Sequence, residues 1–266
     1  MSIAATYQEL PLQHLDARRI EALWRFAPRQ AGVHRVLPDG RIDLLVRFDL
    51  HARDAISNIR LIIAGPAQRY TTLPTERDTA LLGVRFRAGW GGACLAIRPA
   101  EIRDLVLLGD DATQVLGAHA LPLLAARTIT QLENALIAVA HTLVAEAMHS
   151  TAQQRAIAAI DLLHFSGGRL AVSALALAVN TSERTLRRDI MDSVGLSVKA
   201  LSSILRFQRT LRLLHTHPGL ALPQLALEGG YSDQAHMTRE FRELGGFTPG
   251  MRPEVALLNL SLDLSI

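Results

Sequence analysis

Three arginines are concentrated in the segment SERTLRR, residues 182–188. If this segment is helical, Arg184, Arg187 and Arg188 lie within about one and a half turns, while Leu186 faces the protein interior. A guanidinium group presents a planar fork of donors that matches phosphate oxygens and the exposed edge of guanine. These three arginines are therefore candidates for base contact with a nucleic acid; an ordinary solvated helix face is the alternative.

A second polar segment, GYSDQAHMTREF, occupies residues 230–241. Glutamine can read adenine and arginine can read guanine, while alanine and the threonine methyl group can contact the methyl group of thymine. Gln234, Ala235, Thr238 and Arg239 are therefore candidates for base contact. A serine before each helix could act as N-cap and bring backbone N–H groups to phosphates. The candidates for phosphate contact are Ser182, Thr185, Ser232, His236, Arg206 and Arg209, with simple surface exposure as the alternative for the histidine and the last two arginines.

Both segments fall in a region of short helices between about residues 153 and 252. A short helix, a tight turn and a longer helix are predicted twice, at Val172–Val179 with Ser182–Val194 and at Leu222–Glu228 with Ser232–Leu244. A helix-turn-helix unit places its second helix in the major groove of DNA. A longer helix predicted at Val198–His215 would set the separation of the two units.

The first half of the chain is predicted to contain β-strands between residues 33 and 86. Apolar and other side chains alternate over residues 42–48, the period of a strand. The preceding Leu37-Pro-Asp-Gly40 is a turn signal, which predicts a hairpin between Val33–Leu37 and Arg41–Phe48. Further strands are predicted at Ile59–Ala64, Gln68–Leu73 and Ala80–Arg87.

An amphipathic helix is predicted over residues 128–149, where apolar residues recur at spacings of three and four. Its apolar face includes Leu132, Leu136, Val139 and Leu143. This face could cover the sheet, or it could form a dimerisation interface in the manner of a coiled coil.

The composition indicates a folded chain of 266 residues with two domains, since 49% of residues are apolar and 20% are charged. The basic excess lies in the second part, because residues 155–252 carry 12 Arg and Lys against 8 Asp and Glu. The sequence contains neither a membrane-spanning run nor a signal-peptide pattern, so a cytoplasmic location without membrane contact is expected. The one cysteine, Cys94, is expected to be buried. Neither a metal nor a cofactor is predicted, since closely spaced Cys and His residues are missing.

An enzyme with a catalytic N-terminal domain and a helical accessory domain is the rival interpretation. His34, Asp39, Asp43 and His51 lie near the ends of predicted strands. Their spacing matches no catalytic motif, so no catalytic residue is predicted.

The second half resembles the DNA-binding domain of AraC-type (AraC/XylS) transcription regulators. The first unit contributes Leu175-Ala176, Ser182–Arg188 and Gly195-Leu-Ser197; the second contributes Leu225-Ala226, Gly230-Tyr-Ser-Asp-Gln234, Phe241, Gly246-Phe-Thr-Pro249 and Arg252. Met237 and Ile190 stand where this family usually has Phe, and Glu240 stands where a small residue is common. The first half is similar, over fewer positions, to the N-terminal domain of a little-characterised subgroup. For that domain the resemblance implies sensing or dimerisation.

The expected fold class is α+β. Residues 1–150 would form a domain of mixed strands and helices whose sheet could be barrel-like, and residues 151–253 would form an all-α domain with two helix-turn-helix units. Aliphatic residues alternate in the tail, residues 254–266, which is expected to dock as an edge strand.

The resemblance implies a sequence-specific DNA-binding transcription factor, modulated by a small-molecule effector or by dimerisation through the N-terminal domain. The expected partners are double-stranded DNA, a small-molecule effector, a second copy of the chain and, for an activator, RNA polymerase. A ligand-independent DNA-binding regulator is a further alternative.

Overall fold

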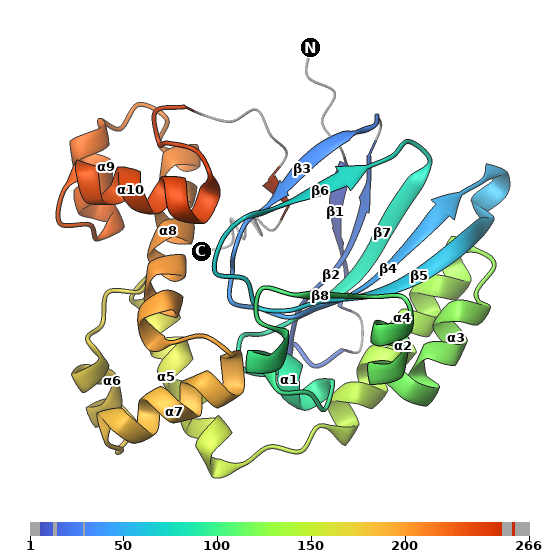
Figure 1. Ribbon diagram of the computed structural model, residues 1–266, viewed down its shortest axis with the longest axis horizontal. Helices are drawn as coiled ribbons and strands as arrows, with labels where there is room; N and C mark the ends of the chain where they lie inside the picture. Colours follow the sequence, from blue (N-terminus) through green and yellow to red (C-terminus); the bar gives the residue numbers. More distant parts are fainter. Residues whose placement is uncertain (1–5, 13–14, 29, 252–256, 259–266) are drawn as a thin grey trace.

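A computed structural model describes residues 6–12, 15–28, 30–251 and 257–258 of the chain. A strand-rich N-terminal domain lies beside a helical C-terminal domain (Figure 1). Each domain has a hydrophobic core of its own. Residues of one core fall between Leu15 and Ala147, and those of the other fall between Ala156 and Phe247, with Leu37 added.

The N-terminal domain contains β-strands, as the period-two pattern predicts, and they form two sheets. The larger is six-stranded and antiparallel, in the order β1-β2-β7-β4-β5-β8, and it is open rather than closed into a barrel. Its strands are β1 (Thr6–Leu10), β2 (Ile20–Ala27), β4 (Asp43–Leu50), β5 (Ile56–Ala64), β7 (Thr79–Phe86) and β8 (Val106–Leu108). The smaller sheet has the order β6-β3-β9, with β3 at Gly32–Val36, β6 at Thr71–Thr75 and β9 at Leu257–Leu258.

The predicted hairpin between Val33–Leu37 and Arg41–Phe48 is wrong. Strand β3 pairs with β6 and β9, whereas β4 pairs with β5 and β7, so the two segments belong to different sheets. The residues between them contact the other domain instead of forming a tight turn. Leu37 is buried in the C-terminal core, and Gln208 Nε2 donates to the Pro38 carbonyl at 2.7 Å.

One face of the large sheet is covered by short helices and by α4 (Ile129–Glu146), whose N-cap is Thr128. Leu132, Leu136, Val139 and Leu143 are at most 5% exposed and share the core of the strands. The apolar face predicted as a dimerisation interface is therefore occupied within the chain. The other elements here are α1 (Gly91–Cys94), η2 (Pro99–Ile102), α2 (Asp110–Leu116) and α3 (Ala120–Ala125). Cys94 is buried, and this burial raises the pKa of its thiol to about 12.

The C-terminal domain consists of six helices in the described residues. They are α5 (Thr151–Phe165), α6 (Val172–Ala178), α7 (Glu183–Val194), α8 (Val198–Thr216), α9 (Leu222–Gly229) and α10 (Gln234–Gly245). The long helix α8 joins the α6–α7 pair to the α9–α10 pair (Figure 1). It corresponds to the helix predicted at Val198–His215. For the tail, Leu257–Leu258 pairs in parallel with Arg35 and Val36 of β3, and the rest of the predicted strand lies outside the described residues.

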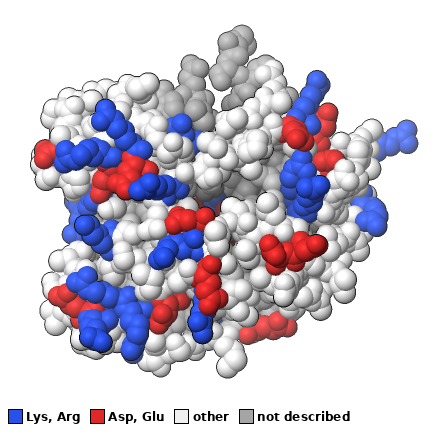
Figure 2. Space-filling model, in the orientation of Figure 1, with Lys and Arg blue, Asp and Glu red and all other residues white. Residues whose placement is uncertain are grey.

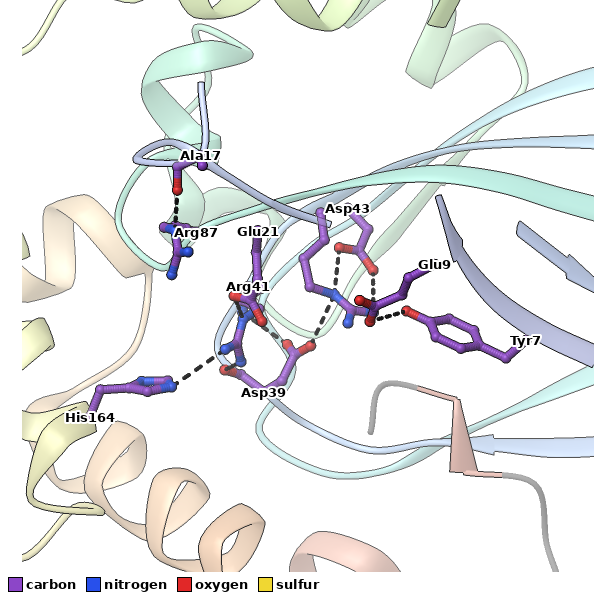
Figure 3. Close-up of polar contacts among 10 residues, drawn as sticks. Tyr7, Glu9, Ala17, Glu21, Asp39, Arg41, Asp43, Arg87 and His164 are labelled. Carbon is purple, nitrogen blue, oxygen red and sulfur yellow. Dashed lines mark hydrogen bonds and ion pairs between the residues drawn. The ribbon is translucent and has the colours of Figure 1, made fainter. Parts of the chain in front are cut away.

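Arg41 joins the two domains at the end of the large sheet (Figure 3). Its guanidinium group pairs with Glu21 and lies 3.5 Å from Nε2 of His164 on α5. Burial tends to raise the pKa of Glu21, but the pair with Arg41 outweighs this and lowers it. Burial, together with the positive charge of Arg41, lowers the pKa of His164 to about 4. The charges of Arg212 and Arg87 act in the same direction, and that of Glu21 opposes them.

We expect protonation of His164 to weaken the folded state. The pKa of His164 is lower in the folded chain than its ordinary value of 6.5, so neutral His164 adds to the free energy of unfolding. This contribution is fully present above pH 6.5 and is lost as the pH falls toward 4. Wild type should therefore lose about 2 kcal/mol more than a His164→Gln variant between pH 7 and pH 4.5. Urea unfolding at both pH values measures this. Equal losses in the two proteins would rule out a neutral, buried His164.

Candidate nucleic-acid interface and the adjoining cavity

The two helix-turn-helix units are built on the same local geometry. The turn between α6 and α7 contains Asn180 at φ +51°, and the turn between α9 and α10 contains Gly230 at φ +86°. Both residues take the left-handed conformation that glycine and asparagine tolerate best. After these turns, Leu186 and Ile190 in α7 and Met237 and Phe241 in α10 are fully buried. The inward faces of α7 and α10 are therefore fixed.

The N-caps of the two helices differ from the prediction in one case. Ser182 caps α7 as predicted, since its Oγ accepts from the Thr185 backbone N–H at 3.1 Å. Helix α10 is capped by Asp233 rather than Ser232, and the Asp233 carboxylate accepts from the His236 N–H at 2.6 Å. This hydrogen bond lowers the pKa of Asp233. One residue separates the left-handed Asn180 from its cap Ser182, whereas two residues separate the left-handed Gly230 from its cap Asp233, which moves the second cap beyond Ser232.

The candidates for base contact lie on the outward faces. Arg184, Arg187 and Arg188 are exposed on α7. On α10, Gln234, Ala235 and Arg239 are exposed, while Thr238 is half-buried and donates to the Gln234 carbonyl at 2.8 Å. Basic side chains gather over α7 at the lower left of the molecule (Figure 2).

The arginines of α7 differ in how strongly they are already paired. Arg187 pairs with Glu183 at 2.8 Å, and Arg188 lies 3.6 Å from the buried Asp189. Arg184 takes part in no ion pair with a described residue. An exposed pair such as Arg187–Glu183 contributes little stability, about 0–1 kcal/mol, so a phosphate can displace it at small cost.

An arginine–carboxylate pair on the inward side of each of these helices binds it to a neighbouring long helix. Arg155 of α5 donates to Asp189 of α7, with Nη2 and Nε 2.8 and 3.2 Å from Oδ2. Arg206 of α8 donates to Glu240 of α10, with Nη2 2.6 Å from Oε1 and Nε 3.3 Å from Oε2. The arginine and the acid of the second pair each lie 51 residues further along the chain than those of the first pair (206 − 155 and 240 − 189). The sequence contains this repeat, but its spacing alone does not reveal that the charges pair.

These contacts change the roles predicted for the phosphate candidates on α8. Arg206 is only 16% exposed, is bound to Glu240 and lies over the Tyr231 ring at 5.0 Å. Arg209 packs against Gly167 and is half-buried. Arg206 is therefore a structural residue in this conformation, and Arg209 is engaged within the domain.

The remaining phosphate candidates lie near the helix N-termini. Thr185 Oγ1 accepts from the Ser182 hydroxyl at 2.9 Å. His236 lies between Ser232, at 3.1 Å from its Nδ1, and Glu240, at 3.6 Å from its Nε2. Ser182 and Ser232 are exposed beside the first turns of α7 and α10. A phosphate could approach the backbone N–H groups there.

Both helices end on a glycine that docks against the N-terminal domain. Gly195 ends α7 and Gly246 ends α10, each in the left-handed conformation. A Cβ atom at Gly195 would lie 2.6 Å from backbone atoms of Pro99, and one at Gly246 would lie 2.4 Å from the Tyr70 ring. Arg103 donates to the Gly195 carbonyl at 3.4 Å. These close approaches attach the C-terminus of each helix to the first domain.

Strand β3 and the β6 region hold the end of α10 with further bonds. Arg35 donates to the Gly245 carbonyl at 3.0 Å and stacks over the Tyr70 ring at 4.7 Å. The Tyr70 N–H donates to the Leu244 carbonyl at 3.0 Å. Arg69 pairs with Glu243 at 3.3 Å.

A cavity of about 2280 Å³ lies between the two docking points. Its floor includes part of the sheet face opposite α4, where Trp24, Leu45 and Ile62 are at most 9% exposed and belong to a small hydrophobic cluster of their own. Lys199 at the start of α8 and residues of α10, among them the exposed Arg239 and the inward Glu240, form another part of the wall. Helix α10 thus borders both the candidate DNA surface and the cavity.

Two family models match separate parts of the chain. Residues 8–107 match a domain of unknown function, DUF6597, and residues 175–251 match a helix-turn-helix domain that spans both units described above. The chain carries an AraC-type helix-turn-helix domain. The protein is a DNA-binding transcription regulator.

Solved structures with low sequence identity are similar to the regulator. The C-terminal domain of AraT, a response regulator from Geobacillus stearothermophilus, is 20% identical, with 42% of this chain and 93% of that chain covered at a TM-score of 0.37. ToxT from Vibrio cholerae is 10% identical, with 92% and 96% covered at a TM-score of 0.43. ToxT with bound unsaturated fatty acid is 13% identical, with 83% and 90% covered at a TM-score of 0.42.

No curated protein is similar enough to the chain to count as a relative. Among the described helices, none is long and apolar enough to cross a membrane. The described residues also contain no group of three or more His, Cys, Asp or Glu side chains that could hold a metal ion.

We expect the Arg206–Glu240 pair to contribute to stability rather than to phosphate binding. Arg206→Ala and Glu240→Ala should each destabilise the regulator, and a double-mutant cycle should give a coupling of about 2 kcal/mol, since both groups are largely buried. Chemical unfolding measures the four proteins. Arg184→Ala, which removes an exposed arginine, should change stability by less than about 0.5 kcal/mol. An unchanged stability in Arg206→Ala with weaker DNA binding would restore the phosphate role.

Proposed function

We propose that the regulator inserts α7 and α10 into successive major-groove segments on one face of its DNA site. The observation that carries this proposal is the matched setting of the two helices, each with a buried inner face and an outward polar face. Major-groove segments on one face recur about every 34 Å, and α8 joins the two units at a fixed separation. Phosphate contacts would position the protein, and base-edge contacts would specify the sequence.

The residues proposed to read bases are the outward arginines of α7 and the outward face of α10. Arg184, with no ion pair in the described residues, is free to reach guanine, and Arg187 and Arg188 can exchange weak pairs for DNA. Gln234 and Arg239 would read adenine and guanine in the second segment, where Ala235 and Thr238 are small enough to meet a thymine methyl group. Ser182, Thr185, Ser232 and His236 are proposed to contact phosphates.

The cavity supports a second part of the proposal, that a small molecule modulates DNA binding. A ligand can shift a conformational equilibrium only if it binds one state better than another. A molecule between the sheet and α10 would satisfy this condition, because moving α10 away from Arg35 and Tyr70 would change its wall. Dimerisation and contact with RNA polymerase remain parts of this proposal, as does a cytoplasmic location beside the DNA.

An enzymatic role receives less support from the N-terminal domain. Asp39 and Asp43 both pair with Arg85, at 3.6 and 3.2 Å, and burial holds this cluster away from water. His51 contacts Ser57 at 2.7 Å on the surface, and His34 packs against the Phe26 ring. These four candidates do not converge on one reactive point, so we propose that the domain senses rather than catalyses.

We expect an Arg188→Ala/Arg239→Ala double mutant to lose specific DNA binding. Each arginine–guanine contact discriminates by about 1–3 kcal/mol, so preference for the gene's own upstream DNA over a scrambled duplex should fall by about tenfold or more. Fluorescence anisotropy at several salt concentrations measures this, and each lost phosphate contact should lower the salt slope by about 0.9. Arg98→Ala, on the N-terminal domain and 84% exposed, is the matched control. Sequence-independent binding by wild type at physiological salt would contradict the proposal.

A further inference from the structure

The loop between α5 and α6 carries an exposed arginine, Arg169, that precedes the first helix-turn-helix unit. Leu175 of that unit corresponds to Leu225 of the second unit, so the position that corresponds to Arg169 is occupied by Gly219 (225 − 175 and 219 − 169). The arginine therefore has no counterpart in the second unit. Its position is instead set by contacts between its loop and the helices of both units.

The loop that carries Arg169 is fixed on the long helix α8. Ser166 Oγ accepts from the backbone N–H groups of Arg169 and Leu170, at 3.3 and 3.4 Å. At Gly168 the backbone packs so closely on α8 that a Cβ atom would lie 2.2 Å from the Ser202 carbonyl oxygen. Because the loop is held from both sides, the direction in which the Arg169 side chain leaves it is held as well.

The Arg169 side chain crosses from the first unit to the turn of the second. A Cβ atom at Gly230 would lie 2.8 Å from Cδ and 2.9 Å from Cγ of Arg169, so the aliphatic part of the arginine packs on the glycine that leads into α10. Nε of Arg169 donates to the Ser166 carbonyl at 2.8 Å. The terminal nitrogens, Nη1 and Nη2, donate to no residue in the described part of the chain. The charged end of Arg169 is thus left open beside the start of α10.

The positive charge at this turn is only partly neutralised. Two arginine side chains converge on Gly230, because Cδ of Arg206 would lie 3.7 Å from the same Cβ atom. Arg206 is bound to Glu240, whereas Arg169 forms no ion pair with any residue that the structure describes. One guanidinium group therefore keeps its full charge next to another, and an anion bound there would reduce their repulsion.

The acids that flank the turn in the sequence are engaged elsewhere. Glu228 accepts from Gln224 Nε2 at 3.0 Å, within α9. Asp233 is the N-cap of α10 and accepts from the backbone of that helix. Neither carboxylate is paired with Arg169, so this arginine is available to a phosphate without first giving up an ion pair.

The turn before α10 lies close to the DNA backbone in the binding mode proposed above. In a helix-turn-helix protein, the N-terminal residues of the second helix contact base edges while the first helix crosses the backbone. Arg169 reaches this turn from the side of the first unit, because its loop packs on α8, which joins the two units (Figure 1). The phosphates on that side belong to the stretch of backbone between the two major-groove segments.

We propose that Arg169 is a phosphate-binding residue of the regulator and that it contacts the DNA backbone between the two major-groove segments. Nη1 and Nη2 donate to the oxygens of a phosphodiester, a geometry that suits the planar guanidinium group. A phosphate contact carries no sequence information, so Arg169 adds affinity and helps to position the two units without selecting bases. The inference rests on the proposed function, because it requires α10 to be seated in the major groove.

The first test measures how DNA binding by the full-length protein depends on salt. Fluorescence anisotropy compares Arg169→Gln and Arg169→Lys with wild type, on the gene's own upstream DNA and on a scrambled duplex. Arg169→Gln should lower the slope of log affinity against log salt by about 0.9 and weaken binding about tenfold at low salt, equally for both duplexes. Arg169→Lys keeps the charge and should keep most of the slope. Arg98→Gln, on the N-terminal domain and 84% exposed, is the matched control and should bind as wild type does.

Three results of this comparison overturn the proposal. The first is an unchanged salt slope in Arg169→Gln. The second is a larger loss on the upstream DNA than on the scrambled duplex, since that marks a base contact. The third is an equal loss of binding in Arg169→Gln and Arg169→Lys with a lowered melting temperature in both, since that assigns Arg169 to holding the loop.

Hydroxyl-radical footprinting locates the contact and separates the two proposals. Wild type should protect two DNA segments about one helical turn apart together with backbone between them, and Arg169→Gln should lose only the protection between them. Two protected segments with the same pattern in Arg169→Gln overturn the Arg169 contact and leave the proposed function in place. A wild-type footprint without two protected segments overturns both.

Discussion

The pairing of an arginine on a long helix with a carboxylate on the next recognition helix is the constraint on which the DNA-facing surface depends. Asp189 is only 2% exposed, and a buried carboxylate without a partner would be costly. Arg155 therefore fixes the rotation of α7 about its own axis, and Arg206 does the same for α10 through Glu240. Since the acids define the inward side, the outward side is determined as well. The same device in both units gives two helices that present corresponding faces.

The glycines that end the recognition helices add a constraint from the other domain. Each takes a backbone conformation with positive φ, and each lies so close to the N-terminal domain that a side chain would collide with it. The arginine pairs thus set the rotation of each helix, and the docked C-termini set where each helix ends. The cavity lies between these two docking points, so a change in its contents acts on contacts at both helices. The ligand sensing of the proposed function would therefore need no long path to the DNA-contacting helices.

The features that the sequence could predict are those decided by local pattern. The helices of the second half, the cap at Ser182 and the buried positions Leu186 and Phe241 follow from periodicity and turn chemistry. The cap predicted at Ser232 is wrong, because the second unit has one more residue between its left-handed turn residue and its cap than the first unit has. A repeat read at a constant spacing does not show this extra residue. The hairpin after Val33 failed for a different reason, since strand pairing depends on distant residues and Leu37 belongs to the other domain's core. The contact of Arg169 with Gly230 could not be predicted, because it requires the packing of two units that lie far apart in the sequence.

The charge arrangement gives the two recognition helices different parts in binding. On α7 the inward acid is neutralised by Arg155, so the three outward arginines outnumber the exposed acids of the helix, Glu183 and Asp192. On α10 the inward acid is neutralised by Arg206, while the outward face carries Arg239 among uncharged Gln234, Ala235 and Thr238. Long-range attraction to phosphate depends on net charge, whereas discrimination depends on the shape and hydrogen-bonding groups of each side chain. Helix α7 is therefore suited to supply most of the attraction and α10 to refine the sequence. Because α10 also borders the cavity, the ligand of the proposed function would act on the helix that selects the sequence rather than on the one that supplies the attraction.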